Sequence, residues 1–162
     1  MLLAAALLLY CHTARPVPQT SSRIPLDERL EKIKMTDLKG RPFTLHQLVG
    51  KPVFLNFWAT WCGPCVSEMQ SIESIYQQYK NDIAFLAVSN EDPAKIRSFI
   101  EKHRLSFDFA HLDIDYTDAY VITMPTTLLI DNRGKLVHEE EGFRDWAQYN
   151  NLGKLKALVQ GK

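Results

Sequence analysis

Two cysteines separated by two residues are the most reactive side chains in the sequence. Cys62 and Cys65 stand in the segment Trp61-Cys62-Gly63-Pro64-Cys65. A spacing of three places both sulfurs on one side of a first helical turn, where they can exchange a disulfide with each other. A purely structural disulfide across so short a loop would stabilise the protein only weakly, because it removes little entropy from the unfolded chain. The pair therefore predicts thiol–disulfide exchange.

The surrounding sequence predicts different roles for the two cysteines. An apolar run ends at Ala59, and Gly63-Pro64 begins a helix, because proline fits the first helical turn. Cys62 thus falls at the helix N-cap, where free N–H groups and the helix dipole lower the pKa of a thiol. Cys65 lies one turn deeper and should be more buried. We predict that Cys62 attacks the target disulfide and that Cys65 resolves the mixed disulfide.

Four residues around this pair are predicted to bind the substrate: Trp61, Pro64, Met124 and Pro125. Trp61 should cover one side of the sulfurs and limit their contact with solvent. The Met124-Pro125 bond precedes an apolar strand and can be cis. A cis Pro125 would turn the Met124 backbone towards the sulfurs, where an extended substrate could pair with it. The alternative is a proline that merely begins a strand.

Glu68 follows Cys65 by three residues and should share its helix face. A partly buried carboxylate beside a thiol has a raised pKa and can exchange a proton with it. From the residues alone, a solvated glutamate that complements the helix dipole is an equally good interpretation.

The remaining sequence predicts the elements that position these residues. By periodicity and turn signals, we expect a hairpin over residues 33–43, helices over 63–80, 93–103 and 145–159, a short helical turn over 45–49, a short helix over 115–120, and strands over 52–59, 83–89, 107–110, 126–130 and 135–143. Strand–helix–strand units followed by a hairpin and a helix are typical of an α/β fold with a central mixed sheet flanked by helices.

Composition excludes several other classes of function. Lysine plus arginine and aspartate plus glutamate number 19 each, so the formal net charge is zero and nothing indicates binding to nucleic acid. The five histidines are dispersed, and there is one C-x-x-C unit, so we expect no metal site. The dithiol itself would carry the electrons, and we expect no separate cofactor.

The sequence of the N-terminal residues is typical of a targeting segment. Residues 1–10 are almost continuously apolar, but ten helical residues rise only about 15 Å, against roughly 30 Å for a bilayer core. Cys11 directly follows. We therefore divide the chain into a signal or lipoprotein-type segment over residues 1–11, a flexible tether over 12–30 and one domain over 31–162. Lipidation of Cys11, a plain signal peptide and an uncleaved anchor all remain open, and each of them exports the domain.

The active-site segment resembles that of thioredoxin-like proteins, and it is most similar to the TlpA/ResA group of extracytoplasmic reductases. The similarity runs from about Met35 to the C-terminus. The matching segments are Asp37-Leu38-Lys39-Gly40, Lys51-Pro52-Val53, Asn56 to Cys65, Leu112-Asp113-Ile114-Asp115, Pro125-Thr126-Thr127 and Asp131-Asn132-Arg133-Gly134.

The resemblance implies a thioredoxin fold with an N-terminal β-hairpin extension. It also implies a cis Pro125, export across the inner membrane into the bacterial periplasm, and an acid/base role for Glu68. Asn56 stands where thioredoxins carry a buried aspartate, so that base is absent. The dipeptide Gly63-Pro64 is the one found in thioredoxin itself, where the TlpA/ResA group often has a charged residue after the first cysteine.

The expected function is therefore an exported, membrane-tethered reductase of disulfide-containing proteins, with apocytochrome c as a candidate substrate. A membrane electron donor would re-reduce Cys62 and Cys65. Two alternatives remain. The first is a peroxiredoxin-like peroxidase, but Thr60 lies two residues before Cys62, not three. The second is a copper chaperone on the same fold, although those proteins typically place three residues between the cysteines.

Overall fold

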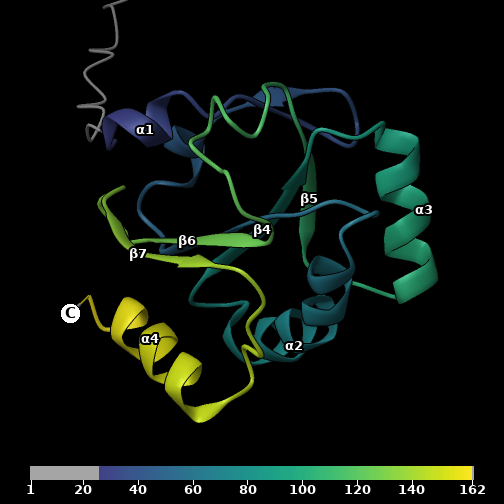
Figure 1. The fold of residues 1–162 in the computed structure, drawn as a ribbon. Coiled ribbons are helices and arrows are strands. Elements are labelled where there is room, and N and C mark those ends of the chain that lie inside the picture. Colours follow the sequence, from purple (N-terminus) through teal and green to yellow (C-terminus); the bar gives the residue numbers. More distant parts are fainter. Residues whose placement is uncertain (1–25, 162) are drawn as a thin grey trace, which may run out of the picture.

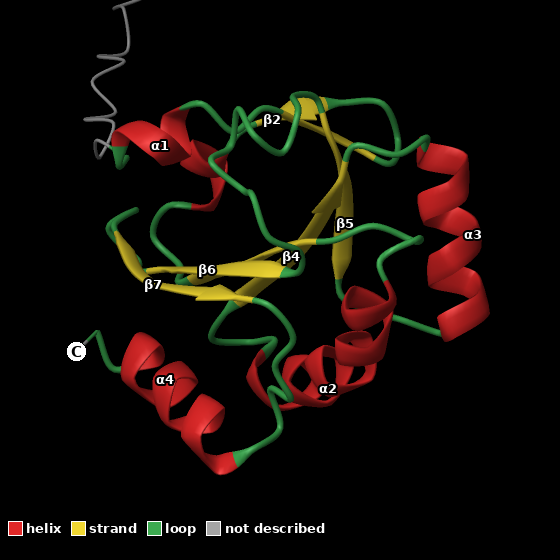
Figure 2. Ribbon diagram, in the orientation of Figure 1, coloured by secondary structure: helices red, strands yellow, loops and turns green. Residues whose placement is uncertain are grey.

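The computed structural model describes residues 26–161, which form a seven-stranded mixed sheet flanked by helices (Figures 1 and 2). The strands are β1 (Met35–Asp37), β2 (Pro42–Phe43), β3 (Val53–Phe57), β4 (Ala84–Ser89), β5 (Asp108–Leu112), β6 (Thr126–Ile130) and β7 (Leu136–Glu141). Their order across the sheet is β2-β1-β5-β4-β3-β6-β7. This arrangement confirms the predicted α/β class and the thioredoxin-type sheet.

The centre of the sheet comes from two strand–helix–strand units. Strands β3, β4 and β5 are parallel, and they are connected by α2 (Gly63–Tyr79) and α3 (Pro93–His103). Strand β6 runs antiparallel to β3, with Phe57 opposite Thr126. The start of β6 therefore lies beside the end of β3. This register brings Pro125 to the sheet edge at which the cysteine-bearing loop begins.

The N-terminal hairpin adds the other edge. Strands β1 and β2 pair with each other, and β1 pairs antiparallel with β5. The turn between them uses the side chain of Asp37, which accepts hydrogen bonds from the backbone N–H groups of Lys39 and Arg41. The predicted β-hairpin extension is thus confirmed.

Alternation along the buried strands divides the apolar residues between two cores. Phe54, Phe85 and Leu129 face one core, together with the buried sides of α2, α3 and α4 (Tyr149–Val159). The neighbouring residues, such as Leu55 and Leu128, face the second core, which contains Leu30 of α1 (Glu28–Glu31). The central strands are covered on both faces, as their continuous apolar sequences predict.

One predicted helix and two predicted boundaries are wrong. Residues 115–120 form turns rather than a helix, because the chain turns out through Tyr120, which has a positive φ of 58°. The last helix begins at Tyr149 and not at residue 145, since Asp145 caps a preceding turn through its side chain. The folded region also includes part of the predicted tether over residues 12–30, because Leu26 and Leu30 are buried in the second core.

The other predicted elements are confirmed to within a few residues, including the 3₁₀ turn η1 (Leu45–Leu48). None of the helices in residues 26–161 combines the length and the apolar character needed to cross a membrane. The targeting segment and Cys11 lie outside the described residues.

Candidate active site

Cys62 and Cys65 lie at the N-terminus of α2, joined by a disulfide with an S–S distance of 2.04 Å. Cys62 is the N-cap, and its Sγ accepts a hydrogen bond from the Cys65 backbone N–H at 3.2 Å. Cys62 retains 6% exposure, whereas Cys65 is fully buried. The predicted difference between an outer and an inner cysteine is confirmed. The same N–H that bonds the sulfur would stabilise a thiolate on Cys62.

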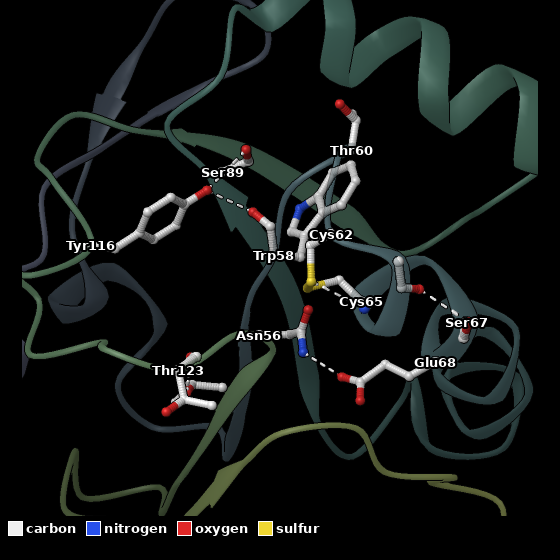
Figure 3. The surroundings of a disulfide bond; sticks show 12 residues. Asn56, Trp58, Thr60, Cys62, Cys65, Ser67, Glu68, Ser89, Tyr116 and Thr123 are labelled. Atoms are coloured by element: carbon white, nitrogen blue, oxygen red, sulfur yellow. Dashed lines mark hydrogen bonds between the residues drawn. A yellow bond between two sulfur atoms is a disulfide. The ribbon is translucent and has the colours of Figure 1, made fainter.

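The loop before Cys62 is fixed by side chains from the ends of neighbouring elements (Figure 3). The Tyr116 hydroxyl donates to the Trp58 carbonyl oxygen at 2.7 Å. The Glu91 carboxylate accepts from both the backbone N–H and the hydroxyl of Thr60. Sequence reasoning missed these two supports. Glu91 follows β4, and side chains after parallel strands converge at one sheet edge, which is the signal that could have found it.

Glu68 lies inside the protein, one helical turn after Cys65, with 1% exposure. One carboxylate oxygen accepts from Asn56 Nδ2 at 2.8 Å, and the other accepts from the Arg144 backbone N–H at 2.9 Å. Burial raises the pKa of Glu68 to about 7, outweighing the hydrogen bonds and the Arg144 charge, which lower it. A glutamate with this pKa can gain or lose a proton at neutral pH.

Asn56 connects the helix to the sheet. It lies in β3 with 1% exposure, and its Nδ2 donates to both Glu68 and the Thr127 hydroxyl, the latter at 2.9 Å. From the sequence, Asn56 indicated only that the buried aspartate of thioredoxins is absent. Its place as the one polar side chain in the buried run Val53–Phe57 could have indicated a hydrogen-bonding role.

The Met124-Pro125 peptide bond is cis, as predicted. The Pro125 carbonyl accepts from the Gly142 N–H at 2.7 Å, and the Thr126 hydroxyl donates to the Thr123 carbonyl oxygen at 2.7 Å. Neither the N–H nor the carbonyl group of Met124 is hydrogen-bonded to another residue of the described chain. The hydrogen-bonding groups of the Met124 backbone are thus unused, just before the start of β6.

Trp61, next to Cys62, is 70% exposed, so most of its surface faces solvent. That its remaining surface covers one side of the sulfurs stays a prediction. Ile122, in the segment that leads to Pro125, is 84% exposed. Pro64 occupies the first turn of α2, as predicted. The cysteine loop and the Pro125 segment therefore each present a large apolar side chain to solvent.

Residues 26–161 contain no group of three or more His, Cys, Asp or Glu side chains arranged to hold a metal ion. Use of the dithiol without a separate cofactor stays a prediction.

Comparisons with known proteins agree with this geometry. Residues 26–139 match the model of the AhpC/TSA family. A thiol-disulfide oxidoreductase ResA from Halalkalibacterium halodurans is 37% identical over 119 residues, which is 71% of this chain and 68% of that protein.

Solved structures show the same fold. A Chlorobium tepidum protein assigned as a thiol:disulfide interchange protein DsbE superposes with a TM-score of 0.72 at 25% identity, covering 83% of this chain and 99% of that one. A secreted Mycobacterium tuberculosis disulfide oxidoreductase gives a TM-score of 0.62 at 26% identity, covering 84% and 99%. The chain therefore belongs to the AhpC/TSA family, and its Cys62–Cys65 pair places it among the thiol–disulfide oxidoreductases of that fold.

Proposed function

We propose that this chain is an exported reductase of protein disulfides, with Cys62 as nucleophile, Cys65 as resolving thiol and Glu68 as proton acceptor. The observation that carries the proposal is the Cys62–Cys65 disulfide at the N-terminus of α2, with the buried Glu68 one turn further along the same helix. Direct disulfide pairing of Cys62 with Cys65 favours dithiol exchange over the peroxidase alternative.

The first step uses the outer cysteine. The Cys62 thiolate attacks one sulfur of the substrate disulfide, forming a mixed disulfide and releasing the other substrate sulfur as a thiolate. The position of Cys62 at the helix N-cap, where its sulfur accepts the Cys65 N–H, supports this role. Stabilisation of the thiolate there makes Cys62 the better nucleophile of the pair.

The second step requires Cys65 to lose its proton inside the protein. The Glu68 carboxylate takes this proton, the Cys65 thiolate attacks Cys62 Sγ, and the second substrate sulfur leaves as a thiolate. The Cys62–Cys65 disulfide is restored, and the substrate has gained two electrons. Because the pKa of Glu68 is about 7, the residue is about half ionised at neutral pH and can both accept and release the proton.

The substrate would bind as an extended segment across the Pro125 loop. The free N–H and carbonyl groups of Met124 offer two backbone hydrogen bonds, which is how strand addition holds a peptide. Trp61 and Pro64 would contact the substrate from the cysteine side. The exposed indole of Trp61 suits this contact, because a flat aromatic surface packs against many different side chains.

The relatives and the N-terminal sequence support the proposed location and partners. The Mycobacterium tuberculosis neighbour is a secreted protein. Export to the periplasm, a lipid anchor at Cys11, a membrane electron donor and a role in cytochrome c maturation are parts of the same proposal. Radiolabelled fatty acid incorporation into wild type, with Cys11→Ser as control, tests the anchor.

The midpoint potential of the Cys62/Cys65 couple tests the direction of electron flow. Equilibration against thiol buffers, followed by alkylation and mass measurement, gives this value. We expect a potential at or below roughly −230 mV, on the thioredoxin and glutaredoxin side of the scale. A value near about −120 mV, as for DsbA, would make the protein an oxidant and overturn the proposed direction.

A further inference from the structure

One buried oxygen in the active site has no hydrogen-bond donor. The amide of Asn56 uses both of its N–H groups, one for Glu68 and one for Thr127, so the orientation of the amide is fixed. Its Oδ1 is then left as an acceptor, and no side chain or backbone N–H of the described residues bonds to it. Native proteins rarely bury a polar atom in this way without a function for it.

The orphan oxygen is directed at the disulfide. Figure 3 shows Asn56 Nδ2 pointing to Glu68 and Oδ1 pointing towards the bonded sulfurs. The positions on α2 agree with this direction. Glu68, which Asn56 contacts through Nδ2, lies three residues after Cys65 and neighbours it on the helix, so the Asn56 amide lies close to Cys65. A disulfide carries no hydrogen, so it cannot satisfy the oxygen.

Reduction supplies the missing donor. A dithiol carries one S–H group on each cysteine, and Cys65 is fully buried, so any acceptor for its S–H must come from inside the protein. Asn56 Oδ1 is the unpaired acceptor among the buried side chains of residues 26–161; the other unpaired atoms are the indole nitrogens of Trp58 and Trp146, which are donors. In the reduced protein, the Cys65 S–H can therefore donate to Asn56 Oδ1, which gives each group a partner.

We propose that Asn56 Oδ1 accepts a hydrogen bond from the Cys65 thiol whenever Cys65 is reduced, and that this bond stabilises the dithiol over the disulfide. The bond requires only the Cys62/Cys65 couple, so it does not depend on which substrate is reduced or on the direction of electron flow. In the oxidised protein the bond is absent, and the buried oxygen remains unpaired.

This arrangement makes the potential of the couple depend on Asn56. In Asn56→Leu, the dithiol loses a hydrogen bond, while the disulfide form no longer buries an unpaired oxygen. Both effects favour the disulfide. We expect the equilibrium constant for reduction to fall about three- to tenfold, which shifts the potential about 15 to 30 mV more negative.

The potentials should be measured on the full chain at pH 8, where Glu68 is largely ionised in wild type and therefore keeps Nδ2 of Asn56 as its donor. Thr127→Val is the matched control: it removes one partner of Nδ2 and leaves Oδ1 untouched. We expect its potential to equal that of wild type. Equal potentials for wild type and Asn56→Leu would overturn the proposal, because a merely structural asparagine, or a water molecule bound to Oδ1 in both states, stabilises both forms alike.

The S–H stretching band in the infrared gives a direct and independent readout. The band of Cys65 is identified in the reduced protein by its loss in Cys65→Ser. We expect it at lower frequency in wild type than in Asn56→Leu, as hydrogen bonding weakens the S–H bond. An unchanged frequency would overturn the proposal. If Asn56→Leu does not fold, Asn56→Ala, which also lacks the acceptor, takes its place in both measurements.

Discussion

Glu68 and Asp131 are buried carboxylates at opposite ends of the sheet, and their environments differ. Asp131 follows β6 at the end remote from the cysteines, with 6% exposure. Its oxygens accept the N–H groups of Arg133 and Lys135 and the Arg133 guanidinium. Burial acts to raise the pKa of Asp131, but these hydrogen bonds and the Arg133 charge outweigh it and hold the pKa below its usual value.

Glu68, by contrast, receives one backbone N–H and one amide, and it has no guanidinium bonded to it. Burial therefore dominates and raises its pKa to about 7. The comparison teaches that two carboxylates of low exposure can have opposite pKa shifts. Glu68 lies deeper in the protein, so burial outweighs its hydrogen bonds, whereas the hydrogen bonds and the charge of Arg133 prevail at Asp131, which lies nearer the surface.

The largest expected effect is on turnover, which should depend on the cysteine end of the sheet and not on the end that carries Asp131. Cys65→Ser should form a stable mixed disulfide with substrate and lose turnover, because nothing resolves the Cys62 adduct. Asp131→Asn should turn over at the wild-type rate. Trapping on a disulfide-containing protein, read by non-reducing electrophoresis, checks both variants. Turnover by Cys65→Ser would show that another thiol resolves the intermediate.

The next effect concerns the proton acceptor. Glu68→Gln should slow resolution of the mixed disulfide about 100-fold at pH 8, since the general base is lost. In wild type, the rate should rise with pH through about 7 as Glu68 ionises. In the variant, the rise should move towards the pKa of the thiol itself, about 8.5 or above. Stopped-flow measurement of resolution gives both profiles, and identical profiles would remove Glu68 from the mechanism.

The contributions of the two carboxylates to the free energy of unfolding should also depend on pH in opposite directions. Glu68 holds its proton more tightly when folded, so its contribution is complete below its usual pKa and is lost as pH rises from about 4.5 to about 7. The loss amounts to a few kcal/mol at about 1.4 kcal/mol per pKa unit. The contribution of Asp131 is lost instead as pH falls through its lowered pKa. Urea unfolding of oxidised wild type and Glu68→Gln across this range isolates the first effect.

The smallest expected effect is on the stability of the turn after β6, which contains Asp131 and Arg133. Asp131→Asn should reduce the free energy of unfolding by about 1 to 3 kcal/mol, because the charged acceptor of the Arg133 hydrogen bonds is removed. Urea unfolding at pH 7 measures this change. Wild-type stability in the variant would mean that the turn holds its conformation without the carboxylate.

Local sequence accounts for much of the cysteine site. Gly63-Pro64 and the preceding apolar strand determine where α2 begins, so the N-cap position of Cys62 was predictable. The cis Met124-Pro125 bond was also predicted, from its place beside the strand and from the family resemblance.

The surroundings of Glu68 were not predictable, because its partners are remote in sequence. The Arg144 N–H comes from 76 positions away, and Asn56 reaches Glu68 only through the packing of α2 on β3. The prediction of a helix over residues 115–120 was wrong for a different reason. Local periodicity indicated a helix, but Tyr120 has a positive φ, which ends the turn.

The most direct test is a ¹³C NMR titration of the side-chain carboxyl groups in the oxidised full chain, with Glu68→Gln and Asp131→Asn used for assignment. Both ends of the sheet are then read in one spectrum. We predict a midpoint near 7 for Glu68 and one below the usual value for Asp131. A Glu68 midpoint near its unperturbed value of about 4.3 would contradict the account, because the carboxylate would then be too weak a base to take up and hold the Cys65 proton at neutral pH.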